Sequence, residues 1–198
     1  MKLDFAWKDD GQIHSYCIVC HGERVEKRAV DGLTKFYCAD CDKLYDRRIE
    51  INPATKTWIA DDGTWWHDVS SIFVRSPDGK FLFFELTKFP YGVTVPAGHI
   101  DSHEEPLQAA VRELQEEVGL TGKPVLAAED ALARESCSRG CDSHVWHSFV
   151  VQLDDTPSVT LNDEGMKPVW LTLDEALDRD LTVPTRFVIE HHKDELLA

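Results

Sequence analysis

The chain has 198 residues, 42% of them hydrophobic, and a formal net charge of −15 at pH 7. Its length and composition predict one or two globular domains with a sizeable core. The negative charge excludes a protein that binds DNA or RNA through a broad basic surface, because such binding depends on Lys and Arg side chains that neutralise phosphates.

The chain shows no sequence signal of membrane insertion or export. No apolar run approaches the roughly 20 residues that a helix needs to span a bilayer, and the opening stretch MKLDFAWKDDGQ has no signal-peptide core. We therefore expect a cytoplasmic protein without a membrane partner. In that compartment the six cysteines are better suited to metal binding than to disulfides.

Four cysteines form two pairs near the N-terminus, with two residues inside each pair and seventeen between the pairs. They are Cys17, Cys20, Cys38 and Cys41. This spacing is typical of a structural Zn²⁺ site, with iron ligation or a redox pair as alternatives. Asp31-Gly32 separates two β-rich runs and predicts a hairpin between the pairs. The pattern predicts a small all-β zinc ribbon over residues 14–51, in which the metal stabilises a segment too short to fold alone.

A linker is expected after the ribbon. Ile49–Pro53 is the last predicted ribbon strand, and the linker runs to about Gly63. Three tryptophans flank this joint, namely Trp58, Trp65 and Trp66. They either pack the ribbon against a second domain or offer a surface on which a nucleobase stacks.

The next segment predicts three strands. Val69–Arg75 and Lys80–Leu86 are β-rich runs on either side of the turn sequence Ser76–Gly79. Tyr91–Val95 is a further short strand, and it leads into a stretch that begins at Gly98.

Residues Gly98–Leu120, GHIDSHEEPLQAAVRELQEEVGL, predict a loop that enters a helix. Glu105 is the expected N-cap and Pro106 the first helical residue, with Gln108 reaching back as in a capping box. Gly119 ends the helix. Four apolar residues at helical spacing predict its buried stripe. They are Leu107, Val111, Leu114 and Val118.

Three carboxylates of this helix stand at i, i+3 and i+4, namely Glu113, Glu116 and Glu117. At about 100° per residue they share one face, well over 100° from the centre of the predicted stripe. Their mutual repulsion costs roughly 0.2–0.5 kcal/mol per i,i+4 pair. A hard divalent cation explains such a cluster, because Mg²⁺ takes oxygen ligands and bridges to substrate phosphates.

The whole segment resembles the Nudix box, which is Gly, five residues, Glu, seven residues, Arg-Glu, an aliphatic, any residue, Glu-Glu, any residue, Gly and an aliphatic. Its fixed positions are filled by Gly98, Glu104, Arg112, Glu113, Leu114, Glu116, Glu117, Gly119 and Leu120. The looser resemblance covers residues 62–190. It implies an α/β fold, an α/β/α sandwich with a mixed sheet, over residues 62–198. The alternative, an acidic solvent-exposed helix, explains neither the glycines nor the spacing.

Two strands are expected downstream, at 124–133 and 143–153, around a turn at 135–142. Cys137, Cys141, His144 and His147 lie close together in the sequence there. Their spacing matches no zinc knuckle, and the odd separation of the two histidines places them on opposite faces of a strand. We interpret them as isolated thiols and packed or surface histidines rather than as a second metal site.

An acidic loop follows, at Asn162–Gly165, before a Trp-containing strand and a helix that Thr172 and Glu175 cap. The family resemblance implies that a glutamate of this loop supplies a metal ligand or the catalytic base. Glu164 is the best match, and an ordinary exposed carboxylate is the competing interpretation. The other candidates are Glu129, Glu135 and Asp163. A final helix is expected from about residue 184.

The resemblance implies a metal-dependent pyrophosphohydrolase. Mg²⁺ or Mn²⁺ would be held by Glu113, Glu116 and Glu117 with the backbone carbonyl of Gly98, and would activate a water molecule. Arg112 would orient the box glutamates by ion pairing. Glu104 would act behind the metal ligands or on a further metal. The general base would be Glu164 or a box glutamate.

A zinc ribbon ahead of a Nudix domain resembles the NADH pyrophosphatase group, but residues 121–145 contain nothing like that group's Ser-Gln-Pro-Trp-Pro-Phe-Pro tract. We therefore expect a nucleotide-type substrate, a nucleoside diphosphate linked to another group, without naming that group. The alternative from another class is a non-catalytic nucleotide sensor whose ribbon contacts a protein or RNA. Family members are often dimers, so a homodimer is expected by analogy alone.

Overall fold

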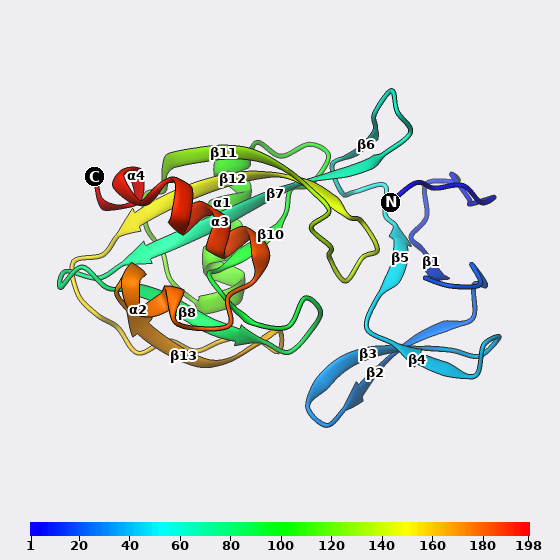
Figure 1. Cartoon of the computed structure of the whole chain (residues 1–198), viewed down its shortest axis with the longest axis horizontal. Helices are drawn as coiled ribbons and strands as arrows, with labels where there is room; N and C mark the ends of the chain where they lie inside the picture. Colours follow the sequence, from blue (N-terminus) through cyan, green and yellow to red (C-terminus); the bar gives the residue numbers. More distant parts are fainter.

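The computed structural model describes residues 1–198, apart from the side chain of Ala133. A small β unit lies beside a larger α/β unit (Figure 1). The small unit holds two sheets, one of β2, β3 and β4 and one of β1 and β5. Their bounds are β1 His14–Cys17, β2 Val25–Val30, β3 Leu33–Cys38, β4 Lys43–Tyr45 and β5 Arg48–Ile51. The predicted hairpin is confirmed, because β2 and β3 pair antiparallel around Asp31-Gly32.

The larger unit is built on one mixed sheet with the order β11-β12-β7-β8-β13. β7 and β12 are parallel, whereas the other pairs are antiparallel. Three short strands pair with its inner strands, β6 and β10 with β7 and β9 with β8. The bounds are β6 Thr57–Ile59, β7 Trp65–Arg75, β8 Phe81–Leu86, β9 Val93–Thr94, β10 Ala97–His99, β11 Val125–Ala133, β12 Ser143–Gln152 and β13 Gly165–Leu171.

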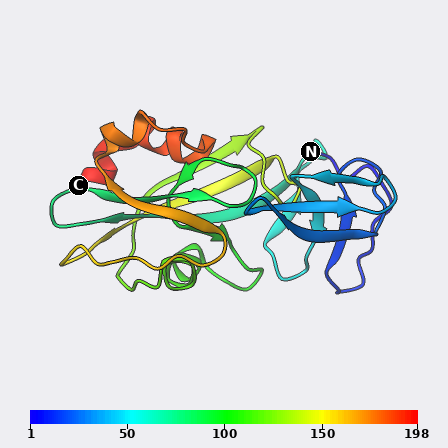
Figure 2. The same ribbon diagram turned by 90° about the horizontal axis from the view of Figure 1, so that it is seen from below.

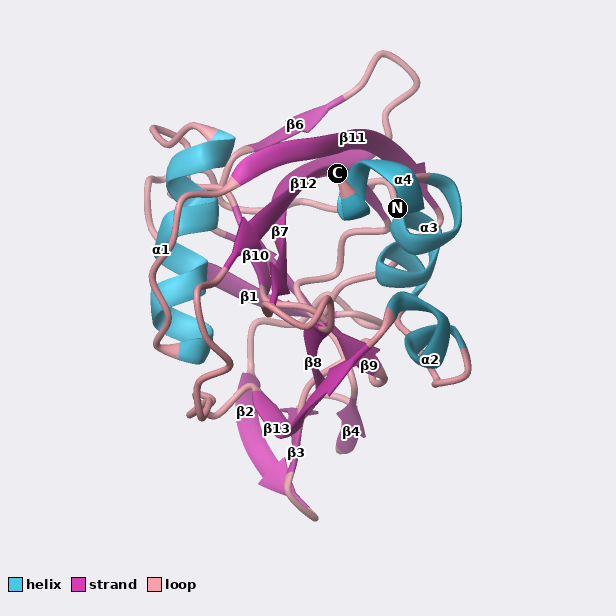
Figure 3. Ribbon diagram, turned by 90° about the vertical axis from the view of Figure 1, so that its left-hand side faces the viewer, coloured by secondary structure: helices cyan, strands magenta, loops and turns pink.

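Helices cover both faces of this sheet, α1 on one side and α2, α3 and α4 on the other (Figure 3). They are α1 Pro106–Val118, α2 Leu173–Leu177, α3 Val183–His191 and α4 Lys193–Leu197. Residues 72–74 of β7 and 81–84 of β8 are apolar without interruption because alternate side chains enter two cores. Ile72 and Leu82 pack toward α1, while Phe73 and Phe83 pack toward α2–α4. The predicted α/β/α sandwich is confirmed. No helix among the described residues is long and apolar enough to cross a membrane.

The sheet opens between β7 and β8, which pair only at Arg75 and Phe81. The chain from β9 to β10 fills the opening, with β9 on the edge of β8 and β10 on the edge of β7. Gly98 therefore lies opposite Ser70, in the gap between two diverging strands. Crevices of this kind in a sheet are where ligands of α/β proteins bind.

Helix α1 begins and ends as predicted but buries a different face. The Gln108 side chain accepts a hydrogen bond from the Glu105 amide at 2.9 Å, and Gly119 ends the helix with φ of 68°. The predicted apolar stripe is wrong at Leu107 and Val111, which are both 48% exposed. The buried residues are Ala109, Ala110, Glu113, Leu114, Glu117 and Val118. This arc is turned by roughly 80° from the predicted stripe, so the helix packs against the sheet with two of its glutamates.

The small unit contacts the larger one through backbone hydrogen bonds, at one end of the molecule (Figure 2). The amide of Thr34 donates to the Thr87 carbonyl at 2.7 Å, and the amides of Arg48 and Glu50 donate to residues 138 and 139 at 3.1 and 3.0 Å. The predicted linker to Gly63 is partly wrong, because it contains β6, which pairs with the start of β7.

Candidate functional site

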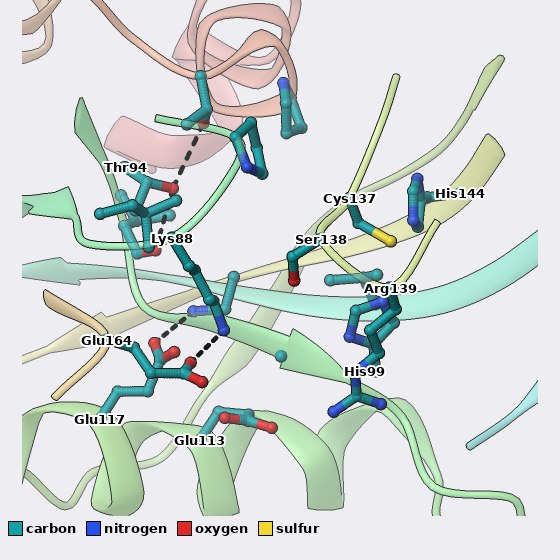
Figure 4. Close-up of a pocket in the computed structure, with 18 of the residues that line it drawn as sticks. Lys88, Thr94, His99, Glu113, Glu117, Cys137, Ser138, Arg139, His144 and Glu164 are labelled. Atoms are coloured by element: carbon teal, nitrogen blue, oxygen red, sulfur yellow. Dashed lines mark hydrogen bonds and ion pairs between the residues drawn. The ribbon is translucent and has the colours of Figure 1, made fainter. Parts of the chain in front are cut away.

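A pocket of about 280 Å³ opens where the sheet splits. Its carboxylate end is formed by α1 and the acidic loop, and its other end by β10, β12 and the 136–142 loop (Figure 4). The carboxylate end carries Glu113, Glu116, Glu117, Glu164, Lys88 and Arg112. The other end carries His99, Glu135, Cys137, Ser138, Arg139, His144 and Trp146. The predicted box helix and the predicted acidic loop thus face one pocket.

Arg112 connects the box residues to one another. Its Nε and Nη2 donate to the two carboxylate oxygens of Glu104 at 3.0 and 2.8 Å. Nη2 also donates to the His99 carbonyl at 3.1 Å, and Nη1 forms an ion pair with Glu113. Burial alone would raise the pKa of Glu104, but the hydrogen bonds from Arg112 and from the Asp101 amide hold it below its usual value. Glu104 therefore fixes Arg112, and Arg112 fixes Glu113 and strand β10.

Glu113 and Glu117 are buried carboxylates, 9% and 4% exposed. Burial raises the pKa of both, and the neighbouring Glu113 charge raises that of Glu117 further, to about 8. Glu117 Oε2 accepts a hydrogen bond from the Ala97 amide at 2.8 Å. Glu116 is more exposed and lies 3.4 Å from Arg112. Two buried carboxylates side by side cost free energy unless a cation or protons compensate them.

Gly98 is packed directly against Glu113. A Cβ atom at this position would lie 1.9 Å from Glu113 Oε1 and 2.0 Å from its carboxyl carbon. The glycine of the box is therefore required by space, because any side chain there would displace the carboxylate.

We expect Gly98→Ala to lower kcat by about 100-fold, the cost that a misplacement of about 1 Å at a reacting group can have. The variant should stay folded, because the group that must move is the end of a flexible side chain. Steady-state kinetics and thermal unfolding measure the two effects. In a Glu113→Ala background the same glycine substitution should add little; an equally large additional loss would show that Gly98 acts by another route.

Glu164 reaches the pocket from the acidic loop. Its carboxylate forms an ion pair with Lys88, and its carbonyl accepts a hydrogen bond from the Thr87 amide at 2.9 Å. The loop is joined to the box helix as well, since the Asn162 amide donates to the Glu117 carbonyl at 3.1 Å. Of the other candidate bases, Glu135 lines the pocket, whereas Glu129 and Asp163 are exposed and do not line it.

The three tryptophans of the joint do not line this pocket. Trp65 is buried beside Tyr16 and Ile49 of the ribbon, as the packing interpretation expects. Trp58 and Trp66 stack on each other, with ring centroids 6.1 Å apart. The aromatic side chains that do line the pocket are Trp146, Phe89 and Phe84.

A sequence model described as the NUDIX domain matches residues 65–191. The chain belongs to the Nudix family. It is 29% identical over 111 residues to the asymmetrical bis(5'-nucleosyl)-tetraphosphatase of Caenorhabditis elegans, a match that covers 54% of this chain and 78% of that protein. Together, the Nudix domain, the intact box and this relative identify the chain as a pyrophosphohydrolase acting on acid anhydrides.

Solved structures show the same fold at low sequence identity. A MutT protein from Methanosarcina mazei Go1 has a TM-score of 0.57 at 19% identity, covering 66% of this chain and 94% of that one. The Nudix hydrolase RenU from M. Smegmatis has a TM-score of 0.54 at 19% identity, covering 70% and 92%. A C. elegans Ap4A hydrolase complex has a TM-score of 0.50 at 22% identity, covering 65% and 92%.

The four ribbon cysteines of this Nudix protein lie together outside the pocket, and their sulfur atoms are all within 4.8 Å of one another. Two Sγ–Sγ distances are 3.7 Å, between Cys17 and Cys41 and between Cys20 and Cys38. Four thiolates around a tetrahedral zinc at 2.3 Å would be about 3.8 Å apart. The arrangement is that of a zinc-ribbon fold.

Sequence reasoning missed part of the pocket of this Nudix domain. His67 and His99 were assigned no role, yet they lie with Cys137 and His144, all with ligand atoms within 4.8 Å of one another. His147, which sequence proximity grouped with His144, points to the other face of β12 and contacts Asp68 and Glu129. The alternation of strand side chains predicts that separation of His144 and His147, but nothing in local sequence connects β7, β10 and β12.

Proposed function

We propose that this protein hydrolyses the pyrophosphate bond of a nucleoside diphosphate linked to another group, with Mg²⁺ or Mn²⁺ held by the Nudix box. The observation that carries the proposal is the convergence of buried Glu113 and Glu117 with Glu164 and Lys88 on one pocket. The chemistry of these donors suits hard divalent cations, which prefer carboxylate and carbonyl oxygens.

The carboxylate end of the pocket fits such an ion. Glu117 has a raised pKa of about 8 because it is buried beside Glu113, and a bound cation would compensate both charges. Glu113, Glu116, Glu117 and the Gly98 carbonyl are the proposed ligands. When bound, the ion neutralises the diphosphate and lowers the pKa of a coordinated water.

The residues of the chain have distinct proposed roles in this reaction. Arg112 holds Glu113 in place, and Glu104 holds Arg112 through two hydrogen bonds. Glu164, 35% exposed at its side chain, is the proposed acceptor of the water proton, because it enters the pocket from a separate loop. Lys88 pairs with Glu164 and is available to a phosphate oxygen once substrate is bound.

The proposed substrate class is nucleotides with a chain of linked phosphates. The related C. elegans enzyme is named for a dinucleoside tetraphosphate, and the two chains are 29% identical over the matched residues. At the far end of the pocket, Arg139 pairs with Glu50 at 3.3 Å and would turn its guanidinium toward a phosphate, while Trp146 offers an aromatic surface to a base. Because the chain carries a net negative charge, it would bind these anionic substrates through the metal ion and the few cationic side chains of the pocket.

We propose Zn²⁺ as the ion of the ribbon, with a structural role. The four thiolates leave no open coordination position, so the ion would hold the ribbon rather than bind substrate. The ribbon in turn supports the pocket, since its Arg47 donates to the Cys137 carbonyl at 3.0 Å and Asp46 accepts from the Tyr91 hydroxyl at 2.8 Å.

A substrate panel tests the proposal. We expect Mg²⁺- or Mn²⁺-dependent cleavage of at least one of NADH, ADP-ribose, dinucleoside polyphosphates, capped RNA and nucleoside triphosphates. The product mixture, resolved by anion-exchange chromatography, identifies the bond that breaks. Reactions with a chelator and with Glu117→Gln serve as controls. Tight nucleotide binding without metal-dependent cleavage of any panel member would overturn the enzyme proposal in favour of a nucleotide sensor.

A further inference from the structure

A second group of metal-ligating side chains lies at the far end of the pocket, apart from the box carboxylates. It consists of His67 from β7, His99 from β10, His144 from β12 and Cys137 from the loop after β11. We propose that this group binds a second zinc ion, distinct from the ion of the ribbon. The proposal does not depend on which substrate the enzyme hydrolyses.

The geometry comes from the sheet. The register of the parallel pair places His144 opposite His67, and the pairing of β10 places His99 opposite Val69 on the same strand as His67. The His67 ring centroid is 4.9 Å from that of His99 and 5.6 Å from that of His144. With Zn–N distances of 2.0–2.1 Å and a Zn–S distance of 2.3 Å, ligand atoms of a tetrahedral site are about 3.3–3.6 Å apart. The ligand atoms here all lie within 4.8 Å, so small side-chain rotations close the site.

Burial of these side chains costs folding free energy unless a ligand binds their unpaired nitrogen atoms. His67 and His144 are 1% and 0% exposed. Both ring nitrogens of His67, and Nε2 of His99 and of His144, are buried without a hydrogen-bond partner among the described residues. Leaving a buried polar atom unpaired costs about 1–3 kcal/mol, and native proteins rarely accept it.

Glu135 completes the environment. Its Oε2 lies 2.5 Å from His144 Nδ1, within ion-pair distance, and it also accepts a hydrogen bond from the Trp146 indole at 3.4 Å. A carboxylate on the outer nitrogen of a histidine orients the ring and leaves the other nitrogen for a metal. Glu135 is 4% exposed, so a buried negative charge balances part of the proposed cation.

The donor atoms select the metal. Three imidazole nitrogens and one thiolate suit zinc, whereas the carboxylates at the other end of the pocket suit magnesium or manganese. Four protein ligands make the site closed, so its role is structural. The two ends of one pocket would therefore bind different metals.

The ion would connect the Nudix box to the ribbon. His99 follows Gly98 directly, and its carbonyl accepts the hydrogen bond from Arg112. Cys137 belongs to the loop whose carbonyls at 138 and 139 accept hydrogen bonds from the ribbon strand β5. A metal bound by His99 and Cys137 would thus fix strand β10, where the Nudix box begins, against the 136–142 loop that contacts the ribbon.

Metal analysis of the full chain tests the proposal. Protein saturated with zinc chloride and desalted should contain two zinc ions per chain by inductively coupled plasma mass spectrometry. Cys137→Ser and Cys38→Ser should each contain one. Cys141→Ser is the matched control, because this neighbouring thiol is buried outside the group, and it should retain two. A single zinc in the wild type, or two in Cys137→Ser, would overturn the proposal.

Cobalt(II) spectroscopy decides the matter if Cys137→Ser does not fold. Titration of zinc-stripped wild type with cobalt chloride should give two binding steps. The ribbon should produce the strong charge-transfer absorption of four thiolates, and the second site the weaker absorption of one thiolate with nitrogen ligands. A single step with the four-thiolate spectrum would contradict the second site.

Discussion

Glu117→Gln should lower kcat by about three orders of magnitude while the protein remains folded. Several kcal/mol of transition-state stabilisation depend on the proposed catalytic metal, and each 1.36 kcal/mol corresponds to a tenfold change in rate. Glutamine has nearly the same shape, and its carbonyl oxygen can still accept the Ala97 amide hydrogen bond that Glu117 now receives. Removing a buried carboxylate also removes a desolvation cost, so the melting temperature in chelator should not fall.

Glu116→Gln should cause a comparable loss of kcat although Glu116 is far more exposed, because metal binding and not burial is the shared property. Glu195→Gln, an exposed glutamate on α4, is the control and should behave as wild type. Steady-state rates on the best panel substrate, with metal titrations, measure these effects. Wild-type turnover in purified Glu116→Gln or Glu117→Gln would refute the assignment of the box glutamates.

The second large effect is expected when the ribbon loses its metal. Cys38→Ser removes a ligand that is 0% exposed, and apart from cysteines the buried apolar side chains of the ribbon are only Tyr16, Phe36 and Ile49. Zinc binding by small ribbon-like domains amounts to about 10–16 kcal/mol of folding free energy. We expect residues 14–51 to unfold locally, while residues 65–191 keep their own two cores.

Loss of the ribbon should also weaken catalysis, because its hydrogen bonds support the loops at 87–91 and 137–142. We expect kcat/KM to fall by about tenfold, which corresponds to 1.4 kcal/mol. Hydrogen–deuterium exchange of ribbon peptides, zinc content and kinetics measure the three consequences. Cys141→Ser, whose thiol lies outside the ribbon cluster, should keep ribbon protection. Full zinc content and unchanged exchange in Cys38→Ser would contradict a metal-dependent ribbon.

The sequence alone determined the parts of this protein whose geometry is local. The spacing of Cys17, Cys20, Cys38 and Cys41 predicted a shared site because short knuckles and one hairpin bring them together. The spacing of Glu113, Glu116 and Glu117 predicted a common helix face because the helical repeat places them there. The family of the domain followed from the same helix and its flanking glycines, and the fold of the matched region agrees with it.

Tertiary packing decided what those local patterns leave open. Periodicity placed the apolar stripe of α1 at Leu107 and Val111, but the helix lies on the sheet with Glu113 and Glu117 buried. An amphipathic pattern shows which residues can be buried, whereas the neighbouring surface selects the face. Here that surface supplies the Ala97 amide to Glu117 and the His99 carbonyl to Arg112, and Arg112 of the same helix pairs with Glu113. The exposed positions of Leu107 and Val111 follow from that choice.

The histidine and cysteine group is the clearest case of a site that only the tertiary structure reveals. His67, His99 and His144 belong to three strands, and the sheet register alone places them side by side. Register depends on long-range pairing, and a shift of one residue would turn each side chain to the opposite face. Sequence proximity instead grouped Cys137 and His144 with Cys141 and His147, which the fold directs elsewhere, and the interpretation of Cys137 as an isolated thiol is wrong. Local spacing thus determined the ribbon and the box, while strand pairing determined what lies between them.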